Sequence, residues 1–326
     1  MESFWNRLPK PFLVMAPMAD VTDAAFRALV ARCGAPNVFW TEFVSADGLY
    51  HTREIGKLPD TENPLMRDLA KSAIERPIVA QIFSSKPEMI SYATKLVSEL
   101  GFDGVDLNMG CPDKSIEKQG CGSAMIKTPE VARAVIRAAK EASALPVSVK
   151  TRVGYNAESL DEWLPVLLEA APAAITLHLR TRKELSLVSA NWELMKKAVA
   201  LRDRINPAVL LIGNGDIQDK EDAETKIAES GCDGAMLGRA LFGNPWVFAG
   251  RKSEDTPLAQ KLAALTELAY AFEKLTPQKN FSILKKHIKA FVTGFDGAAE
   301  LRAQLMQTET ASELARVLTE STVVVP

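Results

Sequence analysis

One string near the middle of the chain could do acid–base chemistry. It reads Asp106-Leu107-Asn108-Met109-Gly110-Cys111-Pro112, so a cysteine follows an apolar run and lies between a glycine and a proline. A thiol with a pKa near its usual 8.5 is mostly protonated at pH 7, and an accessible Cys111 can therefore act as a general acid. The alternative is a buried thiol in a turn, because free cysteine is among the most buried residue types. A second thiol, Cys121, follows ten positions later; we favour Cys111 because it directly follows the predicted strand.

Two glycine-containing segments late in the chain are typical of a phosphate site. Asn214-Gly215-Asp216 follows one apolar run, and Gly238-Arg239 follows the next. Glycines let backbone N–H groups approach a phosphate, and an arginine adds a bidentate contact. The alternative interpretation is that these glycines only form turns.

These residues require elements that bring them together. Short, β-branched apolar runs alternate with helical periodicity, which predicts βα units on a parallel sheet. The expected strands are Phe12–Ala16, Val38–Phe43, Ile78–Phe83, Gly104–Asn108, Val147–Lys150, Ala174–His178, Ala208–Gly213 and Ala235–Gly238.

A polar residue stands at or near the end of most of these runs. The residues are Gln81, Asn108, Lys150, His178 and Asn214. In a closed barrel such ends converge on one face, whereas in an open sheet they spread along an edge. No G-x-G-x-x-G follows the first strand, which further weakens a dinucleotide-binding open sheet. We therefore predict a (βα)₈ TIM barrel, an α/β fold.

Helix boundaries and a linker divide the chain. Thr128 and Asp219 are candidate N-caps, and glycine ends the helices before two similar segments that begin at Gly101 and Gly231. The stretch 249–257 is polar and predicts a linker, and residues 258–326 show helical periodicity without a strand. We expect a barrel over 1–248 and a small C-terminal all-helical domain over 258–326.

Composition excludes several classes of protein. The 326 residues include 39 Lys and Arg against 41 Asp and Glu, a net charge of −2, and 47% are hydrophobic. These values argue against a disordered chain, and no charge-free apolar run is long enough to span a membrane. The four cysteines are widely spaced and far from the three histidines, so we expect no metal site. The start has no apolar signal region, and we expect a cytoplasmic protein with free thiols.

Six motifs, in order along the barrel, resemble the tRNA-dihydrouridine synthase family. They are Met15-Ala16-Pro17-Met18-Ala19-Asp20 with Phe26-Arg27, the string around Cys111, Val149-Lys150-Thr151-Arg152, His178-Leu179-Arg180-Thr181-Arg182, Ile212-Gly213-Asn214-Gly215-Asp216, and Met236-Leu237-Gly238-Arg239 with Asn244-Pro245-Trp246. The chain departs from the common pattern at Asp20, Cys121 and Leu179, where many members have Gly, Ala, and Gly or Ala.

The resemblance implies an FMN-dependent enzyme that reduces the C5=C6 bond of particular uridines in tRNA. NADPH is the implied electron donor, with NADH as an alternative. Hydride would pass from flavin N5 to C6 and a proton from Cys111 to C5. The implied flavin contacts are Pro17, Met18, Ala19, Gln81, Lys150 and His178, with Asn214, Gly215, Asp216, Gly238 and Arg239 at the phosphate end.

A local basic patch is the expected RNA contact. Between Lys274 and Lys289 there are five lysines and no acidic residue. We expect Asn108, Arg180, Arg182, Lys285, Lys286 and Lys289 to bind the substrate; the alternative for the lysines is an ordinary solvated helix face. Two other functions stay open: an FMN-dependent dihydroorotate or dihydropyrimidine dehydrogenase acting on a free pyrimidine, and an RNA-binding protein on an inactive barrel. A monomer is the expected state.

Overall fold

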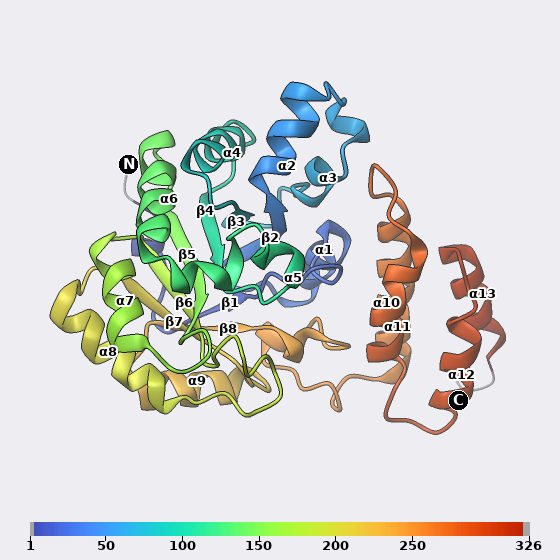
Figure 1. The fold of residues 1–326 in the computed structure, drawn as a ribbon. Coiled ribbons are helices and arrows are strands. Elements are labelled where there is room, and N and C mark those ends of the chain that lie inside the picture. The colour runs from blue at the N-terminus through green and yellow to red at the C-terminus, as the bar shows by residue number, and fades with distance from the viewer. Residues whose placement is uncertain (1–2, 322–326) are drawn as a thin grey trace.

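The apolar runs form the eight predicted strands of a parallel barrel. The computed structural model describes residues 3–321 (Figure 1). The strands are β1 (Phe12–Met15), β2 (Phe39–Ser45), β3 (Ile78–Phe83), β4 (Gly104–Met109), β5 (Val147–Arg152), β6 (Ala174–His178), β7 (Leu210–Asn214) and β8 (Gly234–Leu237). β5 runs two residues beyond its predicted end because Thr151 and Arg152 pair with Leu177 and His178, and polar side chains gave no apolar signal there.

The strand order closes the sheet into the predicted TIM barrel. Neighbours pair in the order β1-β8-β7-β6-β5-β4-β3-β2. The ring closes between β1 and the start of β2, where Val14 bridges Val38 and the Met15 N–H donates to the Val38 carbonyl at 3.1 Å. Closure brings the carboxyl ends of all eight strands to one face.

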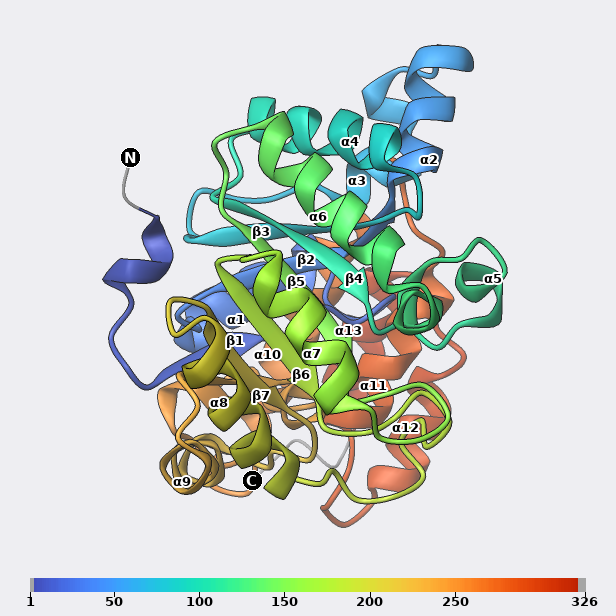
Figure 2. The same cartoon turned by 60° about the vertical axis from the view of Figure 1, so that its left-hand side comes forward.

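Helices surround the barrel, as Figure 2 shows for its flank. The barrel's helices are α1 (Ala24–Gly34), α2 (Ala46–Tyr50), α3 (Pro64–Asp68), α4 (Pro87–Glu99), α5 (Lys114–Glu117), α6 (Pro129–Ala142), α7 (Leu160–Glu169), α8 (Glu193–Ile205) and α9 (Lys220–Ser230). The Asp219 side chain caps α9 as predicted, and Gly231 ends it in the left-handed conformation. α6 begins directly after Thr128 as predicted, but the Thr128 side chain makes no capping bond.

Strand alternation divides the apolar side chains between two cores. Phe12, Val14 and Ala16 face the barrel interior together with Trp40 and Trp5, while Leu13 and Met15 belong to the larger core that includes the surrounding helices. Trp5 comes from a single turn of 3₁₀ helix before β1, and its ring lies 5.9 Å from that of Trp40. An apolar interior at the amino end leaves the inward polar positions to the carboxyl end of the barrel.

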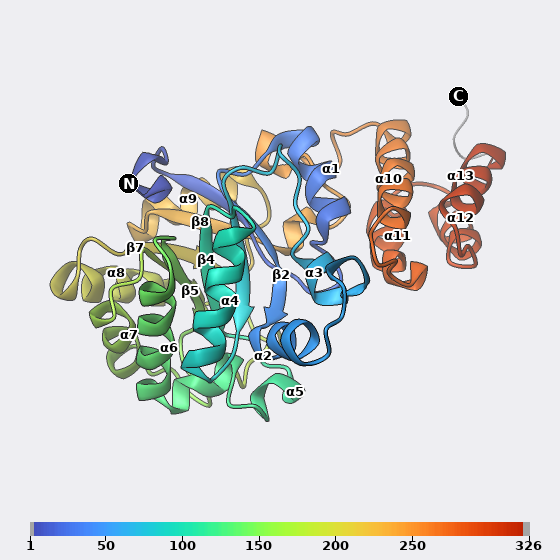
Figure 3. The ribbon, with the colours of Figure 1, turned by 90° about the horizontal axis from the view of Figure 1, so that it is seen from above.

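The predicted helical region follows the barrel. Its helices are α10 (Leu258–Glu273), α11 (Lys285–Phe291), α12 (Ala298–Leu305) and α13 (Ala311–Glu320), and they lie on the side of the barrel where α1 is found (Figure 3). The rings of His287 in α11 and Phe26 in α1 pack in a tilted arrangement with their centroids 4.5 Å apart, and His287 Nε2 hydrogen-bonds the Val21 carbonyl at 3.1 Å. In the described range, 3–321, no helix is long and apolar enough to cross a membrane.

Candidate functional site

A cavity of about 250 Å³ lies at the carboxyl ends of the strands. Most of the predicted cofactor residues line it: Pro17, Met18, Lys150, His178, Asn214, Gly215, Asp216, Gly238 and Arg239. Strand register explains the grouping, because His178 is paired with Asn214 and Asn214 with Met236 across three neighbouring strands. Ala19, Gln81, Asn108 and Cys111 lie outside this lining.

Lys150 presents an unpaired cation to the cavity. Within the described chain, its ammonium group makes no hydrogen bond or ion pair, although the residue is half-buried. Burial lowers the pKa of Lys150 to about 8, and repulsion from Arg152 adds to the effect; Asp106 and Cys111 partly oppose it. A buried ammonium group without a partner is unfavourable unless a ligand supplies one. The position therefore suits an electron-rich ligand atom.

A charged network lines the same cavity. The Arg180 guanidinium donates to His178 Nε2 at 3.1 Å and to the Asp216 carboxylate at 2.5 Å. Because a guanidinium only donates, His178 Nε2 must accept, which leaves the proton of the neutral ring on Nδ1. Burial lowers the pKa of His178, and the nearby positive charges of Lys150 and Arg152 lower it further. His178 is therefore a neutral donor at physiological pH.

The network carries a net positive charge. Arg239 also pairs with Asp216, so two guanidinium groups share one carboxylate. Arg180 was predicted to contact RNA from an open loop, but it is 2% exposed and lines the cavity. The structure thus places Arg180 beside the predicted phosphate end of the cavity. In this conformation its side chain is not exposed on the surface where RNA was predicted to bind.

Backbone donors complete this end of the cavity. Among the described residues, the N–H groups of Gly215, Asp216, Gly238 and Arg239 have no hydrogen-bond acceptor. A Cβ on Gly238 would meet its nearest neighbours, Ala16 and Met18, at 3.5 Å, so the backbone there is open to the cavity. Free N–H groups next to Arg239 form a donor set typical of phosphate binding.

Position 215 requires glycine, both for its backbone conformation and for the space around it. Its φ is +128°, and a Cβ would lie 2.7 Å from the Ala190 Cβ. We expect Gly215→Ala to lower the free energy of unfolding of the ligand-free protein by about 1–3 kcal/mol more than Gly101→Ala does, because only Gly215 adds a clash. Gly101 is the matched control, with φ +71° and nothing within 4 Å of a Cβ. Urea unfolding measures both; equal losses would contradict the role of crowding at Gly215.

A polar layer inside the barrel lies beside the cavity residues. The Gln81 amide donates to Asp106 at 2.7 Å, Ser148 donates to the other Asp106 oxygen at 2.6 Å, and Asn108 donates to the Gln81 carbonyl at 3.3 Å. Gln81 is 1% exposed, and the amide nitrogen has a second N–H that these bonds do not use. Burial raises the pKa of Asp106 to about 6. Sequence reasoning missed Asp106, although its spacing of two from Asn108 places both on one face of the strand.

Cys111 is held on a short, fully bonded turn after β4. Asn108 Oδ1 accepts the Gly110 and Cys111 N–H groups at 3.1 and 3.0 Å, and the Ser123 N–H and hydroxyl both donate to the Cys111 carbonyl at 2.9 Å. Arg152 donates to the Gly110 carbonyl at 2.8 Å. Asn108 was predicted to bind substrate; its amide oxygen orients the Cys111 turn, and its amide nitrogen has one N–H beyond the bond to Gln81, so the contact with substrate stays a prediction.

The two candidate thiols differ in accessibility. Cys111 is half-buried, and burial raises its pKa, so the thiol is protonated at neutral pH. Cys121 is 1% exposed and packs with Phe83 and Ile116. A proton donor needs access to its acceptor, and this contrast favours Cys111. β4 pairs with β5 through Asn108 and Lys150, so Cys111 leaves the strand next to the cavity's cation.

The predicted RNA-binding residues fall into separate groups. Lys286 and Lys289 are exposed on α11 and Lys285 is half-buried, while Arg182 makes a bidentate pair with Glu117. Lys279 and His287, from the same basic stretch, are 6% and 1% exposed. The surface patch is therefore smaller than the run of lysines suggested. No cluster of three or more His, Cys, Asp or Glu residues able to hold a metal occurs in 3–321.

Comparison with known proteins places the chain among relatives of similar length. The family model described as "Dihydrouridine synthase (Dus)" matches residues 14–324. The probable tRNA-dihydrouridine synthase of Staphylococcus aureus (strain COL) is 40% identical over 322 residues, covering 98% of this chain and 95% of the relative. The probable tRNA-dihydrouridine synthase 2 of Bacillus subtilis (strain 168) is 40% identical over 324 residues, with 97% and 96% covered.

Solved structures share the fold alone. A 2-naphthoyl-CoA reductase complex has a TM-score of 0.55 at 11% identity, covering 74% of this chain and 50% of that one. Histamine dehydrogenase from Rhizobium sp. 4-9 has a TM-score of 0.53 at 12% identity, covering 95% and 63%. This chain thus spans between half and two thirds of those longer proteins.

Proposed function

The chain belongs to the dihydrouridine synthase family of flavin-dependent oxidoreductases, and from this premise we propose that it reduces the C5=C6 bond of particular uridines in tRNA, with bound FMN and with NADPH as electron donor. NADH is the alternative donor. The observation that carries the proposal is the cavity that pairs an unpartnered Lys150 with a phosphate-type donor set.

The residues present fit FMN. Lys150 would lie against the electron-rich edge of the ring system, where a cation stabilises the anionic reduced form. His178 would donate from Nδ1, and Pro17, Met18 and Ala19 would pack on the ring. Gln81 has an N–H to spare, though it lies in the polar layer and outside the cavity lining. Gly215, Asp216, Gly238 and Arg239 would hold the phosphate, and Arg180 would add positive charge there.

Cys111 would supply the proton of the reaction. When bound, the flavin supplies hydride to C6 of the uracil. Negative charge then develops at C5 and the neighbouring carbonyl, and the protonated Cys111 thiol would transfer its proton to C5. Burial favours the protonated thiol at the start of the reaction, and the bonds from Asn108, Ser123 and Arg152 hold the turn that presents it.

The helical region over 258–326 would bind tRNA next to the cavity. A uracil in folded tRNA must be unstacked to reach a flavin, so the enzyme must grip the surrounding backbone. Lys286 of α11 lies 3.4 Å from Asp20, which follows the cavity residues Pro17 and Met18. Lys286 therefore adjoins the site, and Lys289 follows it on the same short helix. We propose that the protein is a monomer. We also propose that it lies in the cytoplasm, a reducing compartment that suits its four free cysteines.

The function is tested on the protein and in cells. We expect the purified protein to show a flavin absorption spectrum and to bind FMN. We also expect dihydrouridine to disappear from one or more tRNA positions when the gene is deleted and to return when it is restored. Unchanged tRNA, together with reduction of free orotate or uracil by the protein, would instead support an enzyme of free pyrimidines.

The lysine patch makes a salt-dependent prediction. Replacing Lys285, Lys286 and Lys289 with alanine should weaken tRNA binding and reduce the slope of log affinity against log salt by about 1 for each phosphate that the variant no longer neutralises. Lys95→Ala on α4, also exposed, is the matched control and should leave the slope unchanged. Filter binding across a salt series measures both; an unchanged slope in the triple variant would remove α11 from the RNA interface.

A further inference from the structure

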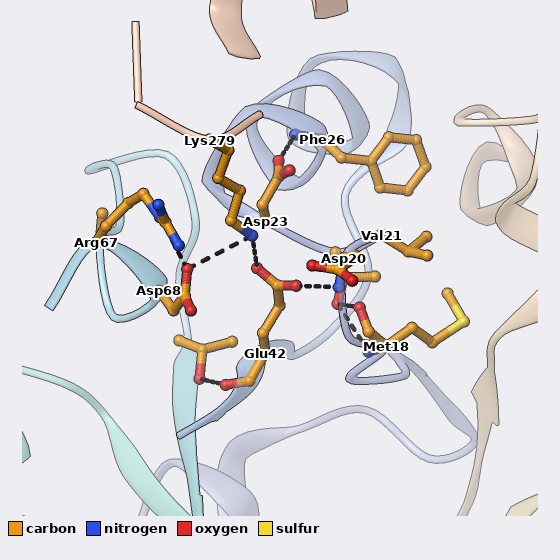
Figure 4. A network of polar contacts seen from close by, with 12 residues as sticks. Met18, Asp20, Val21, Asp23, Phe26, Glu42, Arg67, Asp68 and Lys279 are labelled. Atoms are coloured by element: carbon orange, nitrogen blue, oxygen red, sulfur yellow. Dashed lines mark hydrogen bonds and ion pairs between the residues drawn. The ribbon is translucent and has the colours of Figure 1, made fainter. Parts of the chain in front are cut away.

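A buried lysine joins the C-terminal helical region to the barrel. Lys279 lies in the segment between α10 and the 3₁₀ turn Phe281–Leu284, and its side chain is 3% exposed. Figure 4 shows it pointing into a group of carboxylates from three barrel segments. Its ammonium nitrogen is 2.7 Å from Glu42 of β2 and 3.4 Å from Asp68 at the end of α3, and Asp23 is close enough to interact by charge.

Glu42 connects this lysine to the cavity loop. One Glu42 oxygen binds Lys279, and the other accepts the backbone N–H of Asp20. Asp20 has a φ of +56°, a left-handed conformation that is uncommon outside glycine, although aspartate adopts it more readily than most residues. It ends the segment whose residues Ala16, Pro17 and Met18 line the cavity. The carboxylate therefore holds the loop in the shape that forms one wall.

The hold on Asp20 depends on the lysine. Glu42 is 4% exposed, and burial raises its pKa while Lys279 opposes that rise. Without a cation, a buried carboxylate takes up a proton or turns towards water, because an unpaired buried charge is strongly unfavourable. Either change weakens or removes the acceptor of the Asp20 N–H.

We propose that Lys279 is a positioning residue for the cofactor site: through Glu42 it fixes the loop Pro17–Asp20, so the helical region that would meet tRNA also completes the flavin pocket. This rests on the proposed function, since the loop matters only if FMN packs on it. Other contacts still join the region to the barrel, including Arg67 to the Pro277 carbonyl at 3.1 Å and the Arg32–Glu267 ion pair. Lys279 is therefore not the sole link between them.

The first test measures FMN affinity without RNA. We expect Lys279→Met to bind FMN at least about tenfold more weakly than the wild type and to shift the visible spectrum of the bound flavin, because Glu42 no longer presents a fixed, charged oxygen to the Asp20 N–H. Glu267→Gln removes an ion pair of the same interface that does not touch the loop, and should bind FMN within about twofold of the wild type. Wild-type affinity and spectrum in Lys279→Met would overturn the proposal.

A matched pair of double variants separates loop positioning from simple attachment of the helices. Glu42→Gln/Lys279→Met and Glu42→Met/Lys279→Met both remove the buried charges, but only the first keeps an oxygen for the Asp20 N–H. We expect the first to recover FMN affinity to within about threefold of the wild type and the second to remain at least about tenfold weaker. Equal affinities in the two would refute positioning through Glu42, even if Lys279→Met alone fails to fold.

The outcomes also separate this inference from the proposed function. If the wild-type protein binds no FMN, the proposed function is refuted, and the inference about Lys279 is refuted with it. If the wild-type protein binds FMN and the variants bind it equally well, only the inference about Lys279 is refuted.

Discussion

Replacing Cys111 with alanine is expected to lower the rate of uridine reduction in tRNA by about 10²–10⁴, the usual contribution of a positioned general acid. The variant should keep bound FMN and should still oxidise NADPH, because Cys111 lies outside the lining of the cavity. Burial keeps the thiol protonated at neutral pH, which is the form a proton donor needs. Single-turnover reduction of tRNA by the pre-reduced enzyme measures the step directly.

Cys121→Ala is the matched control for this experiment. It removes a thiol from the same loop region, but one that is 1% exposed and packed among apolar side chains. We expect nearly wild-type uridine reduction in this variant. Full activity in Cys111→Ala combined with loss of activity in Cys121→Ala would reverse the assignment.

Replacing Lys150 with methionine is expected to weaken FMN binding by about 10- to 150-fold. That range corresponds to the 1.5–3 kcal/mol typical of a hydrogen bond to a charged group. The reason is that Lys150 has no partner within residues 3–321 and faces the cavity. Fluorescence titration with FMN measures the loss, and Lys127→Met, an exposed lysine over the Tyr155 ring, should leave the affinity unchanged. Unaltered FMN affinity in Lys150→Met would exclude a direct contact.

The lowered pKa of Lys150 predicts that the stability of the FMN-free protein depends on pH. Its pKa is about 8 in the folded state and near 10.5 when unfolded, so the unfolded chain holds more protons between these values. The free energy of unfolding, relative to Lys150→Met, should therefore rise by about 3 kcal/mol as pH increases from 8 to 10.5. Urea unfolding of both proteins across this range measures the difference. A flat difference would show that the ammonium group is well solvated.

Strand positions and the face they share could be read from the sequence. Val147 and Val149 are apolar and β-branched, and the alternation of a strand then sends Ser148 and Lys150 to the interior. His178 and Asn214 each end a predicted or observed strand, and the pairing of β6 with β7 places them beside each other. The position of Cys111 likewise followed from the strand that precedes it.

Residues beyond the strand ends were harder to place, because their surroundings come from distant segments. Arg180 and Arg182 lie two positions apart on one loop, yet Arg180 is buried against Asp216 and Arg182 pairs with Glu117. Asn108 was expected to meet the substrate, and the structure adds a role that spacing did not indicate, because its amide oxygen holds the Cys111 turn. Loop conformation, and not spacing, decides which of these side chains faces the cavity.

The sequence by itself determined the barrel, the cysteine turn and the family, since each depends on short-range periodicity or on motifs that stand in order. Only the tertiary structure decided which lysines between Lys274 and Lys289 are exposed and which are buried. Lys286 and Lys289 remain exposed, whereas Lys279 is buried against Glu42, 237 positions earlier in the chain. A run of like charges shows that a segment is basic, but the exposure of each lysine depends on which acidic groups the fold brings to meet it, because burying a lysine's charge is unfavourable unless such a partner or a bound ligand offsets its loss of water.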